Sequence, residues 1–532
     1  MDTITVPNPR RWRILGVLCV ALFAIVMDNT IVNVALPTLA RELHADTSRL
    51  QWIVDAYTLV FAGLLLAAGG LGDRFGRKPA LIAGLVAFGS FSVAGALASS
   101  SGQLIAARAF MGVGAALIFP TTLAIAVNVF TDARERAAAI GIWTAVTGVG
   151  VALGPISGGW LLEHFSWGSV FLVNVPIVIA AAAGAIWLVP NSRDPRAPKL
   201  DLAGLGLSIA GISLLVWSLI EAPRHGWLST TTLGGIALAV ALLAVFALWE
   251  RHVPEPLLDV RLFRNRRFSA ASLAVTLGFF SLFGFIFLVT QYFQLVKGYS
   301  ALQAGVRTVP FAVAMAIGAI TAPQIVKRAG TKLVVAAGLT LMAAGFAVAA
   351  TTDAASSYGI IVVAMLFMGS GLGVALTPAT ESILGALPRD QAGVGSAVND
   401  TTREVGGTLG VAVLGSIMAT LYGAKVVDAL RGSGLPAALR QTAGDSLAAA
   451  LQIASRVGGT AGSGIARTAQ DAFVHAFQVG SVVTGCVALA GAAIALVFLP
   501  ARVAEEEPLE LVIGGGERDR PEVEPARGRA VR

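Results

Sequence analysis

Residues 69–78 read GGLGDRFGRK and separate two long apolar runs. About twenty apolar residues flank this turn on each side, enough for each run to cross a bilayer as a helix. The turn combines glycines with charged side chains, which are Gly72, Asp73, Arg74, Gly76, Arg77 and Lys78. The glycines let the chain reverse and two helices approach, the carboxylate can cap or pair, and the basic side chains favour the cytoplasmic side.

The composition points to a membrane protein. The 532 residues are 56% hydrophobic and 13% charged, and the mean hydropathy is +0.77, which is too apolar for a soluble globule. A net charge of +7 is compatible with nucleic-acid binding, but Lys and Arg lie in short loops between apolar runs, where they orient membrane proteins. We therefore predict an all-α polytopic membrane protein with no nucleic-acid partner.

Fourteen apolar runs can be counted as spans. They begin near Ile14, Gln51, Pro79, Gly102, Ala137, Gly168, Leu200, Thr231, Phe268, Gln303, Lys332, Tyr358, Gly393 and Phe473. The first run is too long for the apolar region of a signal peptide, so we expect it to be retained. With a cytoplasmic amino terminus, the inner loops carry most of the Lys and Arg. This predicts both termini in the cytoplasm and a location in the cytoplasmic (inner) membrane.

An internal repeat divides the chain. Residues 73–85 align with 327–339, and 134–141 align with 389–396 at nearly the same offset. This predicts two pseudo-symmetric halves of six spans with two extra spans between them. The expected parts are a first half at 1–192, two extra helices at 193–266, a second half at 267–500 with an outer loop at 422–472, and a disordered cytoplasmic tail at 501–532. The outer loop is expected to be a partly helical cover over the second half, with a docking or gating role as the alternative.

A carboxylate lies inside the otherwise apolar first span. Asp28, in MDNTIVNVALP (27–37), is about eight residues, or roughly 12 Å, from the outer end of its helix. A charge near the bilayer centre costs about 2.5–3.5 kcal/mol, so it needs a partner, a wet cavity or a proton. Arg108 in the fourth span lies roughly 9 Å deep by the same measure. We expect Asp28 and Arg108 to form a proton-responsive pair; the alternative is that Asp28 only caps or bonds a neighbouring helix.

A second charged group lies in NDTTREVGGTLG (399–410) of the thirteenth span. Asp400, Arg403 and Glu404 have helical spacing that places them near one face, so Arg403 can neutralise one carboxylate while the other titrates. A satisfied charge cluster near the cytoplasmic mouth explains the pattern equally well. For Asp55, near the outer end of the second span, an interfacial position is favoured over a function.

The fifth span contains GVGVALGPISGG (148–159). Its small and helix-breaking residues are Gly150, Gly154, Pro155, Gly158 and Gly159, three of them at i, i+4 and i+8. A flat glycine ridge beside a proline kink permits close helix approach and bending, and by physics alone this is a packing feature.

These motifs, together with LIAARAFMGVGAAL (104–117), resemble the fourteen-span drug:proton antiporter family of the EmrB/QacA type, in the major facilitator superfamily. The resemblance covers 10–500 and implies the major facilitator fold and export of small amphipathic compounds in exchange for protons. It assigns Asp73, Arg74 and Arg77 to a conformational latch, Arg108 to the fourth-span motif, and Gly154 with Pro155 to an antiporter hinge. The second-half loop departs from the pattern, because Lys327 stands where the first half has Asp73.

Other classes of function find little support. No Lys follows a Gly, so there is no Walker A loop, and we expect no enzyme activity. The histidines and the two cysteines lack ligand spacing, so we expect no metal and no cofactor besides the proton gradient. The expected partners are membrane lipids, protons and small substrates of unknown identity, and the chain is expected to be a monomer. An uptake symporter on the same fold and a non-transporting membrane sensor are the rival hypotheses.

Overall fold

The computed structural model describes residues 9–193, 200–387, 392–432 and 434–500, and this part of the chain is helical with short connections and no strand. The predicted tail at 501–532 lies outside the described residues. The helices are α1 (Arg11–Glu42), α2 (Thr47–Phe75), α3 (Arg77–Ala96), α4 (Ser101–Val129), α5 (Ala133–His164), α6 (Ser169–Leu172), α7 (Asn174–Leu188), α8 (Leu202–His225), α9 (Thr230–Glu250), η1 (Val260–Arg264), α10 (Arg266–Gln291), η2 (Tyr292–Val296), α11 (Ala301–Arg307), α12 (Val309–Ala329), α13 (Thr331–Ala349), α14 (Tyr358–Leu384), α15 (Ala392–Ala429), α16 (Ala437–Asp445), α17 (Leu447–Val457) and α18 (Gly459–Phe498).

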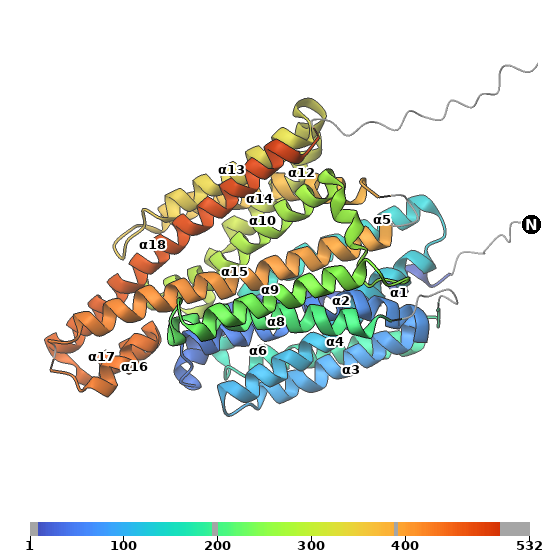
Figure 1. The fold of residues 1–532 in the computed structure, drawn as a ribbon. Helices are drawn as coiled ribbons and strands as arrows, with labels where there is room; N and C mark the ends of the chain where they lie inside the picture. The colour runs from blue at the N-terminus through green and yellow to red at the C-terminus, as the bar shows by residue number, and fades with distance from the viewer. Residues whose placement is uncertain (1–8, 194–199, 388–391, 433, 501–532) are drawn as a thin grey trace, which may run out of the picture.

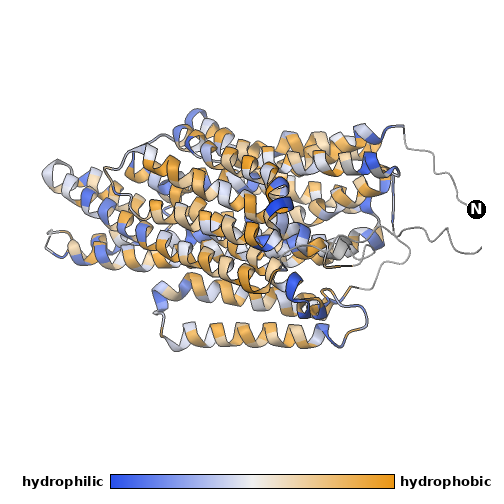
Figure 2. Cartoon of the chain, turned by 90° about the horizontal axis from the view of Figure 1, so that it is seen from above, coloured by the Kyte–Doolittle hydropathy of each residue, from blue (hydrophilic) through white to orange (hydrophobic). Residues whose placement is uncertain are grey.

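Fourteen helical segments in the described residues are long and apolar enough to cross a bilayer, as the sequence predicts. Helices satisfy their own backbone hydrogen bonds, which is the condition for lying in lipid. Polar side chains cap the N-termini of the helices: the Asp46 carboxylate accepts a hydrogen bond from the Arg49 amide, and Ser300 forms a capping box with Gln303. Figure 2 shows hydrophobic residues along the helices and hydrophilic residues gathered toward their ends.

The sequence repeat corresponds to a repeated turn. Gly76 joins α2 to α3 with φ of 112°, and Gly330 joins α12 to α13 with φ of 83°; both values favour glycine. The close helix contact that follows is repeated too. A Cβ on Gly84 would lie 2.9 Å from the carbonyl oxygen of Gly114, and one on Gly338 would lie 2.6 Å from that of Gly371.

The helix contacts follow one pattern twice. In the first set α1 packs on α5, and α2 and α3 pack on α4; in the second, α10 packs on α15, and α12 and α13 pack on α14. Helices α8 and α9 form a hairpin, and α8 packs against both α2 and α15. The extra pair therefore lies against the line where the two sets meet.

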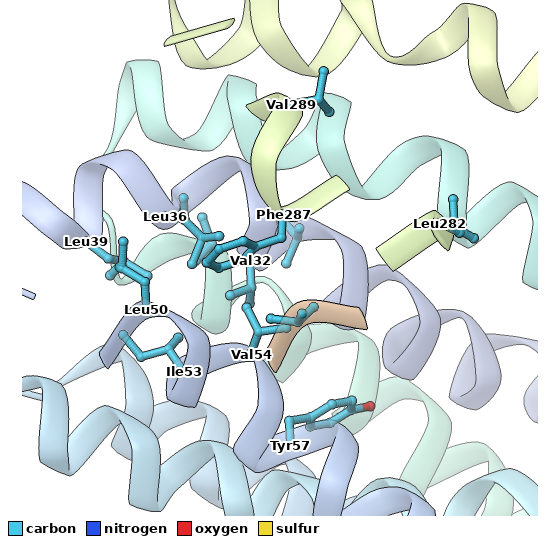
Figure 3. Close-up of a cluster of buried hydrophobic side chains, with 14 of the residues drawn as sticks. Val32, Leu36, Leu39, Leu50, Ile53, Val54, Tyr57, Leu282, Phe287 and Val289 are labelled. Carbon is cyan, nitrogen blue, oxygen red and sulfur yellow. The ribbon is translucent and has the colours of Figure 1, made fainter. Parts of the chain in front are cut away.

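The two sets meet at the end of the molecule that carries the loops 43–46, 165–168 and 297–300, called the closed end below. There α2 packs on α15 and α5 packs on α11, whereas toward the other end the sets diverge (Figure 1). One buried apolar cluster crosses between the sets: Figure 3 shows Phe287 of α10 beside Val32 and Leu36 of α1. Apolar packing therefore seals this end.

In the described residues the segment 422–472 is largely helical and includes α16 and α17. Helix α15 continues to Ala429 and α18 already begins at Gly459, so the connection between them is shorter than the hydropathy predicts. The connection also reaches beyond the second set, because α17 packs on α1 as well as α18, and Thr47 of α2 donates to the Asp445 carbonyl at 3.0 Å.

Candidate functional site

Asp28 lies at the centre of a buried polar cluster built from three helices. Arg108 of α4 forms an ion pair with Oδ2 of Asp28, and Asn174 of α7 donates to Oδ1 at 2.8 Å. All three side chains are 0% exposed. A buried carboxylate is tolerated when a cation and hydrogen-bond donors compensate for its lost hydration, and both are present here. The structure thus brings together the two side chains that the sequence placed at similar depth.

The other contacts of Arg108 tie the cluster to α2. Its Nε donates to the carbonyl of Ile53 at 3.1 Å, and its guanidinium lies 4.2 Å from the ring centroid of Tyr57. The cation is therefore held by a carboxylate, a carbonyl and an aromatic face. Asn174 and Tyr57 were not identified from the sequence. A polar amide in the apolar run VFLVNVPIV (170–178) is the signal that would have indicated Asn174.

The α15 group is also assembled, with looser contacts. Arg403 Nη1 lies 3.8 Å from Asp400 Oδ1, and Nη2 donates to the Thr380 hydroxyl at 3.2 Å. Glu404 Oε2 is buried and has no hydrogen-bond partner. The side chains of Asp400, Arg403 and Glu404 are only partly buried as a whole, in contrast to the sealed Asp28 cluster. This group is therefore more accessible than the Asp28 cluster.

The two charged groups face the same stretch of α2. Tyr57 is near enough to Asp28, Arg108 and Glu404 to interact electrostatically with all three. Close by, the Thr408 hydroxyl of α15 donates to the Thr58 hydroxyl at 3.0 Å. Sequence reasoning treated the two groups as separate sites, whereas the fold connects them through α2.

The turn at 72–78 makes its described contacts within the first set of helices. Asp73 pairs with Arg77 at 2.7 Å, one helical turn away. The Arg77 amide donates to the Ser192 carbonyl at 2.8 Å, and Lys78 donates to the Ile186 carbonyl at 2.7 Å. Arg74 is exposed. In this conformation the turn is held against the C-terminal end of α7 and the coil residues that follow it. This is the end of the molecule opposite to the closed end.

The glycine face of α5 fits against α1. A Cβ on Gly150 would lie 3.0 Å from Cβ of Val26, and one on Gly154 would lie 2.9 Å from the Met27 carbonyl oxygen. Gly158 meets Ile31 in the same way, at 2.5 Å from its Cγ1.

The next glycine of α5 faces the second set of helices. A Cβ on Gly159 would lie 2.5 Å from Cα of Leu302 in α11. The carbonyl of Pro155 lies directly against Gly305, and Glu163 accepts from the Leu302 amide at 3.3 Å. The sequence motif therefore forms part of the contact between the two sets.

Asp55 is buried between helices, which its position near the end of the second span did not indicate. Its side chain is 0% exposed, and neither carboxylate oxygen has a hydrogen-bond partner. The position of Asp55 near the end of its span did not indicate this burial, because α8 and α15 cover this part of α2. Across the described residues, no group of three or more His, Cys, Asp or Glu side chains is placed to hold a metal ion.

Comparison with known proteins places this architecture in a family. Residues 18–411 match the model of the Major Facilitator Superfamily. The multidrug efflux pump LfrA of Mycolicibacterium smegmatis is 35% identical over 91% of this chain and 95% of its own length. The tetracenomycin C resistance and export protein of Streptomyces glaucescens is 34% identical over 95% and 94%.

Further similarity extends to another resistance protein and to solved structures. The methyl viologen resistance protein SmvA of Salmonella typhimurium is 35% identical over 88% of this chain and 94% of its own. The fold is similar to that of a bacterial homologue of the human lysosomal transporter Spinster, with a TM-score of 0.64, 18% identity, and coverage of 94% of this chain and 100% of that one. The match of residues 18–411 to the family model, together with the repeated helix packing and the fourteen apolar helices of the described residues, shows that the chain belongs to the major facilitator superfamily.

Proposed function

We propose that this protein exports drugs or other small amphipathic compounds across the cytoplasmic membrane in exchange for protons. The efflux and resistance roles named for LfrA, the tetracenomycin C exporter and SmvA support export as the direction. The observation that carries proton exchange is the sealed cluster of Asp28, Arg108 and Asn174 within membrane-spanning helices. An ionisable group buried at such a cost is best explained by a role in the transport cycle.

In this proposal the helix sets rock about their contact to give alternating access. With both termini in the cytoplasm, the closed end is extracellular, and the conformation described here faces the cytoplasm. Opening to the outside separates α2 from α15 and α5 from α11. Gly154, Pro155 and Gly159 act as the hinge, because they let α5 bend where it contacts both α1 and α11.

The turn at 72–78 is the proposed latch at the cytoplasmic end. In the outward-facing state the cytoplasmic ends of the two sets approach, and the charges of Asp73, Arg74 and Arg77 become available to the second set. The pairing of Asp73 with Arg77 in the present conformation keeps that carboxylate occupied until then.

Proton and substrate would compete at the Asp28 cluster. A proton on Asp28 neutralises the carboxylate charge that holds Arg108. Conversely, a bound cationic or bulky substrate favours loss of that proton. Asp400, Arg403 and Glu404 form the second group, on the more accessible side. At a proton-motive force of about 180 mV each proton supplies roughly 4 kcal/mol, enough for about a thousandfold gradient of a neutral compound.

This proposal divides the chain into a first half at 1–192, an extra helix pair at 193–266 and a second half at 267–500. The protein is proposed to act as a monomer surrounded by lipid. Each half alone holds one charged group, Asp28 with Arg108 in the first and Asp400 with Glu404 in the second. Coupling between proton and substrate then requires both halves.

The test uses inside-out vesicles and the compounds named for the relatives, methyl viologen and tetracenomycin C, as first probes. The parent protein should accumulate a transported probe when an imposed gradient makes the vesicle lumen acidic, and a protonophore should abolish accumulation. Asp28→Asn should still bind a neutral probe but not concentrate it, and Asp28→Glu should retain partial activity with a shifted pH optimum. Accumulation by Asp28→Asn equal to the parent would refute coupling at Asp28, and accumulation driven by the opposite gradient would indicate a symporter.

A further inference from the structure

A pair of carboxyl groups lies where the two extra helices meet. Asp201 caps the N-terminus of α8, and its Oδ1 accepts from the Gly204 amide at 2.9 Å. Glu250 is the last residue of α9. Because α8 and α9 form a hairpin, both residues lie at the same end of it, which is cytoplasmic in the orientation proposed above. The pair belongs to neither of the charged groups on α1 and α15.

Gly204 brings the two carboxyl groups together. A Cβ on this buried glycine would meet both Glu250 Oε1 and Asp201 Oδ2, the second at 2.5 Å. The two oxygens therefore border the same small space, which a larger side chain would fill. At this separation the two side chains interact electrostatically and are within hydrogen-bonding reach of each other.

Hydrogen-bond donors reach three of the four carboxyl oxygens. Besides the Gly204 amide on Asp201 Oδ1, the Trp249 indole donates to Asp201 Oδ2 at 2.8 Å, and the Leu258 amide donates to Glu250 Oε2 at 2.9 Å. Glu250 Oε1 is buried and has no partner, and the residue as a whole is 1% exposed. A buried oxygen that faces a second carboxylate and receives no donor is unstable as part of an anion.

No cation pairs with these carboxyl groups in the described part of the chain. The charged or titratable side chains of the neighbouring segments at this end are Asp73 and Arg74 of α2, Arg251, His252, Glu255 and Asp259 after α9, Arg261 and Arg264 of η1, and Asp400, Arg403 and Glu404 of α15. Among the described residues, none of them forms an ion pair with Asp201 or Glu250. The remaining charges of α8, at 221–225, lie at the opposite end of that helix.

A single proton satisfies this arrangement. We propose that Asp201 and Glu250 form a cytoplasmic proton-binding site, in which Glu250 Oε1 carries the proton and donates it to Asp201 Oδ2. Two carboxyl groups held this close cannot both ionise without strong repulsion, so one of them retains a proton. A metal ion fits less well, because N–H donors already occupy the other three oxygens.

The bound proton would fasten the connection between α9 and α10. Glu250 holds the Leu258 amide, and Leu258 packs against the buried cluster that contains Phe268 and Ala271 of α10. Loss of the proton makes the two carboxylates repel, so the Glu250 side chain moves away and releases this connection. The closed pair binds one proton more than the open pair, so the ratio of closed to open molecules should fall by up to about tenfold per pH unit.

The first experiment detects the proton in the full-length protein in lipid nanodiscs. Infrared difference spectra between the parent and Glu250→Gln are recorded from about pH 6 to about pH 9. Gln resembles the protonated carboxyl group in shape and charge, so the variant should keep the fold. We expect the parent to show a C=O band of a protonated carboxyl group that Glu250→Gln lacks, and this band should disappear as the pH rises.

The second measurement follows the connection itself. Hydrogen–deuterium exchange of peptides from 251–262 is compared between the parent and Glu250→Gln at the same pH, so that intrinsic exchange rates cancel. Exchange should be equal at about pH 6, where both pairs are closed, and faster in the parent at about pH 9, where only the parent can ionise. Equal exchange at both values would refute the fastening role.

Further variants test whether the proton is shared. In Asp201→Asn the side-chain amide can donate to Glu250 and stabilise its ionised form, so the carboxyl band should disappear at lower pH than in the parent. Gly204→Ala should shift the band in the same direction, because its Cβ separates the two oxygens. Gly206→Ala is the matched control in the same helix, where a Cβ would meet nothing within 4 Å, and its band should titrate as in the parent.

A parent protein without a carboxyl band that depends on Glu250 would overturn the proposal. A band that titrates identically in Asp201→Asn and the parent would show that Glu250 holds its proton without Asp201, and the paired site would be wrong. The result is separable from proton-driven export, because neither residue belongs to the Asp28 cluster. If vesicle transport does not follow the proton gradient but the band follows Glu250 and Asp201, the proposed function fails and this inference stands.

Discussion

The amide nitrogen of Asn174 donates to Oδ1 of Asp28 at 2.8 Å, across 146 residues of sequence. Arg108 occupies the other carboxylate oxygen, so both oxygens of Asp28 are satisfied in the membrane interior. Asn174 is thus a positioning residue, because it fixes the orientation in which the carboxylate meets the guanidinium. Its own second neighbour is the hydroxyl of Ser92, at the longer distance of 3.5 Å.

Replacing Asn174 by Ala should alter proton dependence more than expression. The lost hydrogen bond leaves one buried oxygen of Asp28 unpaired, which costs about 1–3 kcal/mol and penalises the ionised form. The pH dependence of export should therefore differ from that of the parent. Ser92→Ala, which removes only the longer contact, is the control and should leave the profile in place. Identical profiles for Asn174→Ala and the parent would contradict a positioning role.

Removing either member of the Asp28 and Arg108 pair should destabilise the protein more than removing both. A single replacement leaves an uncompensated buried charge, which costs about 3–5 kcal/mol, whereas the double replacement leaves none. Thermal unfolding in detergent should place Arg108→Gln lowest and the Asp28→Asn and Arg108→Gln double variant above it. Export should stay absent in the double variant. Additive losses of stability would mean that the two side chains do not interact energetically.

Gly159→Ala should hinder closure between α5 and α11. The added Cβ would meet the backbone of Leu302 at 2.5 Å, and backbone yields less easily than a flexible side chain. Overpacking of this kind costs roughly 1–3 kcal/mol and acts only on the closed conformation. Export should fall while expression is kept, and thiol labelling of a cysteine placed at the closed end should rise.

The matched control for this prediction is Gly148→Ala in the same helix, where a Cβ would meet nothing within 4 Å. Its export should equal that of the parent. Equal loss in the two variants would indicate that α5 requires glycine for flexibility, and that the contact with α11 is not the cause.

The orientation in the membrane can be tested with reporter fusions. Reporters placed after Lys78, Arg136, Arg267 and Lys332 should be cytoplasmic, because these positions lie at helix ends next to the basic connections. A reporter at Gly434, in the connection between α15 and α16, should be external. An internal signal from Gly434 would show that the number of spans before it is wrong, and the arrangement of six, two and six helices would have to be abandoned.

Spans and turns were open to prediction because they depend on local properties. A run of about twenty apolar residues satisfies its hydrogen bonds and its hydration within one helix, so hydropathy suffices to find it. The glycine turn at 69–78 and its counterpart near Gly330 were equally visible, since a reversal between two helices requires a residue that tolerates positive φ. The unusual charges were visible too, because Asp28 and Glu404 stand out in apolar surroundings.

What the sequence left open depends on contacts between distant segments. Asp28 and Asp55 are both carboxylates within apolar runs, and only the packing of α4, α7, α8 and α15 gives one of them a cation and an amide and leaves the other alone. Local chemistry determines which segments enter the membrane, whereas the partner of each buried charge is decided by the tertiary fold, because a low-dielectric interior makes that partner the dominant energetic factor.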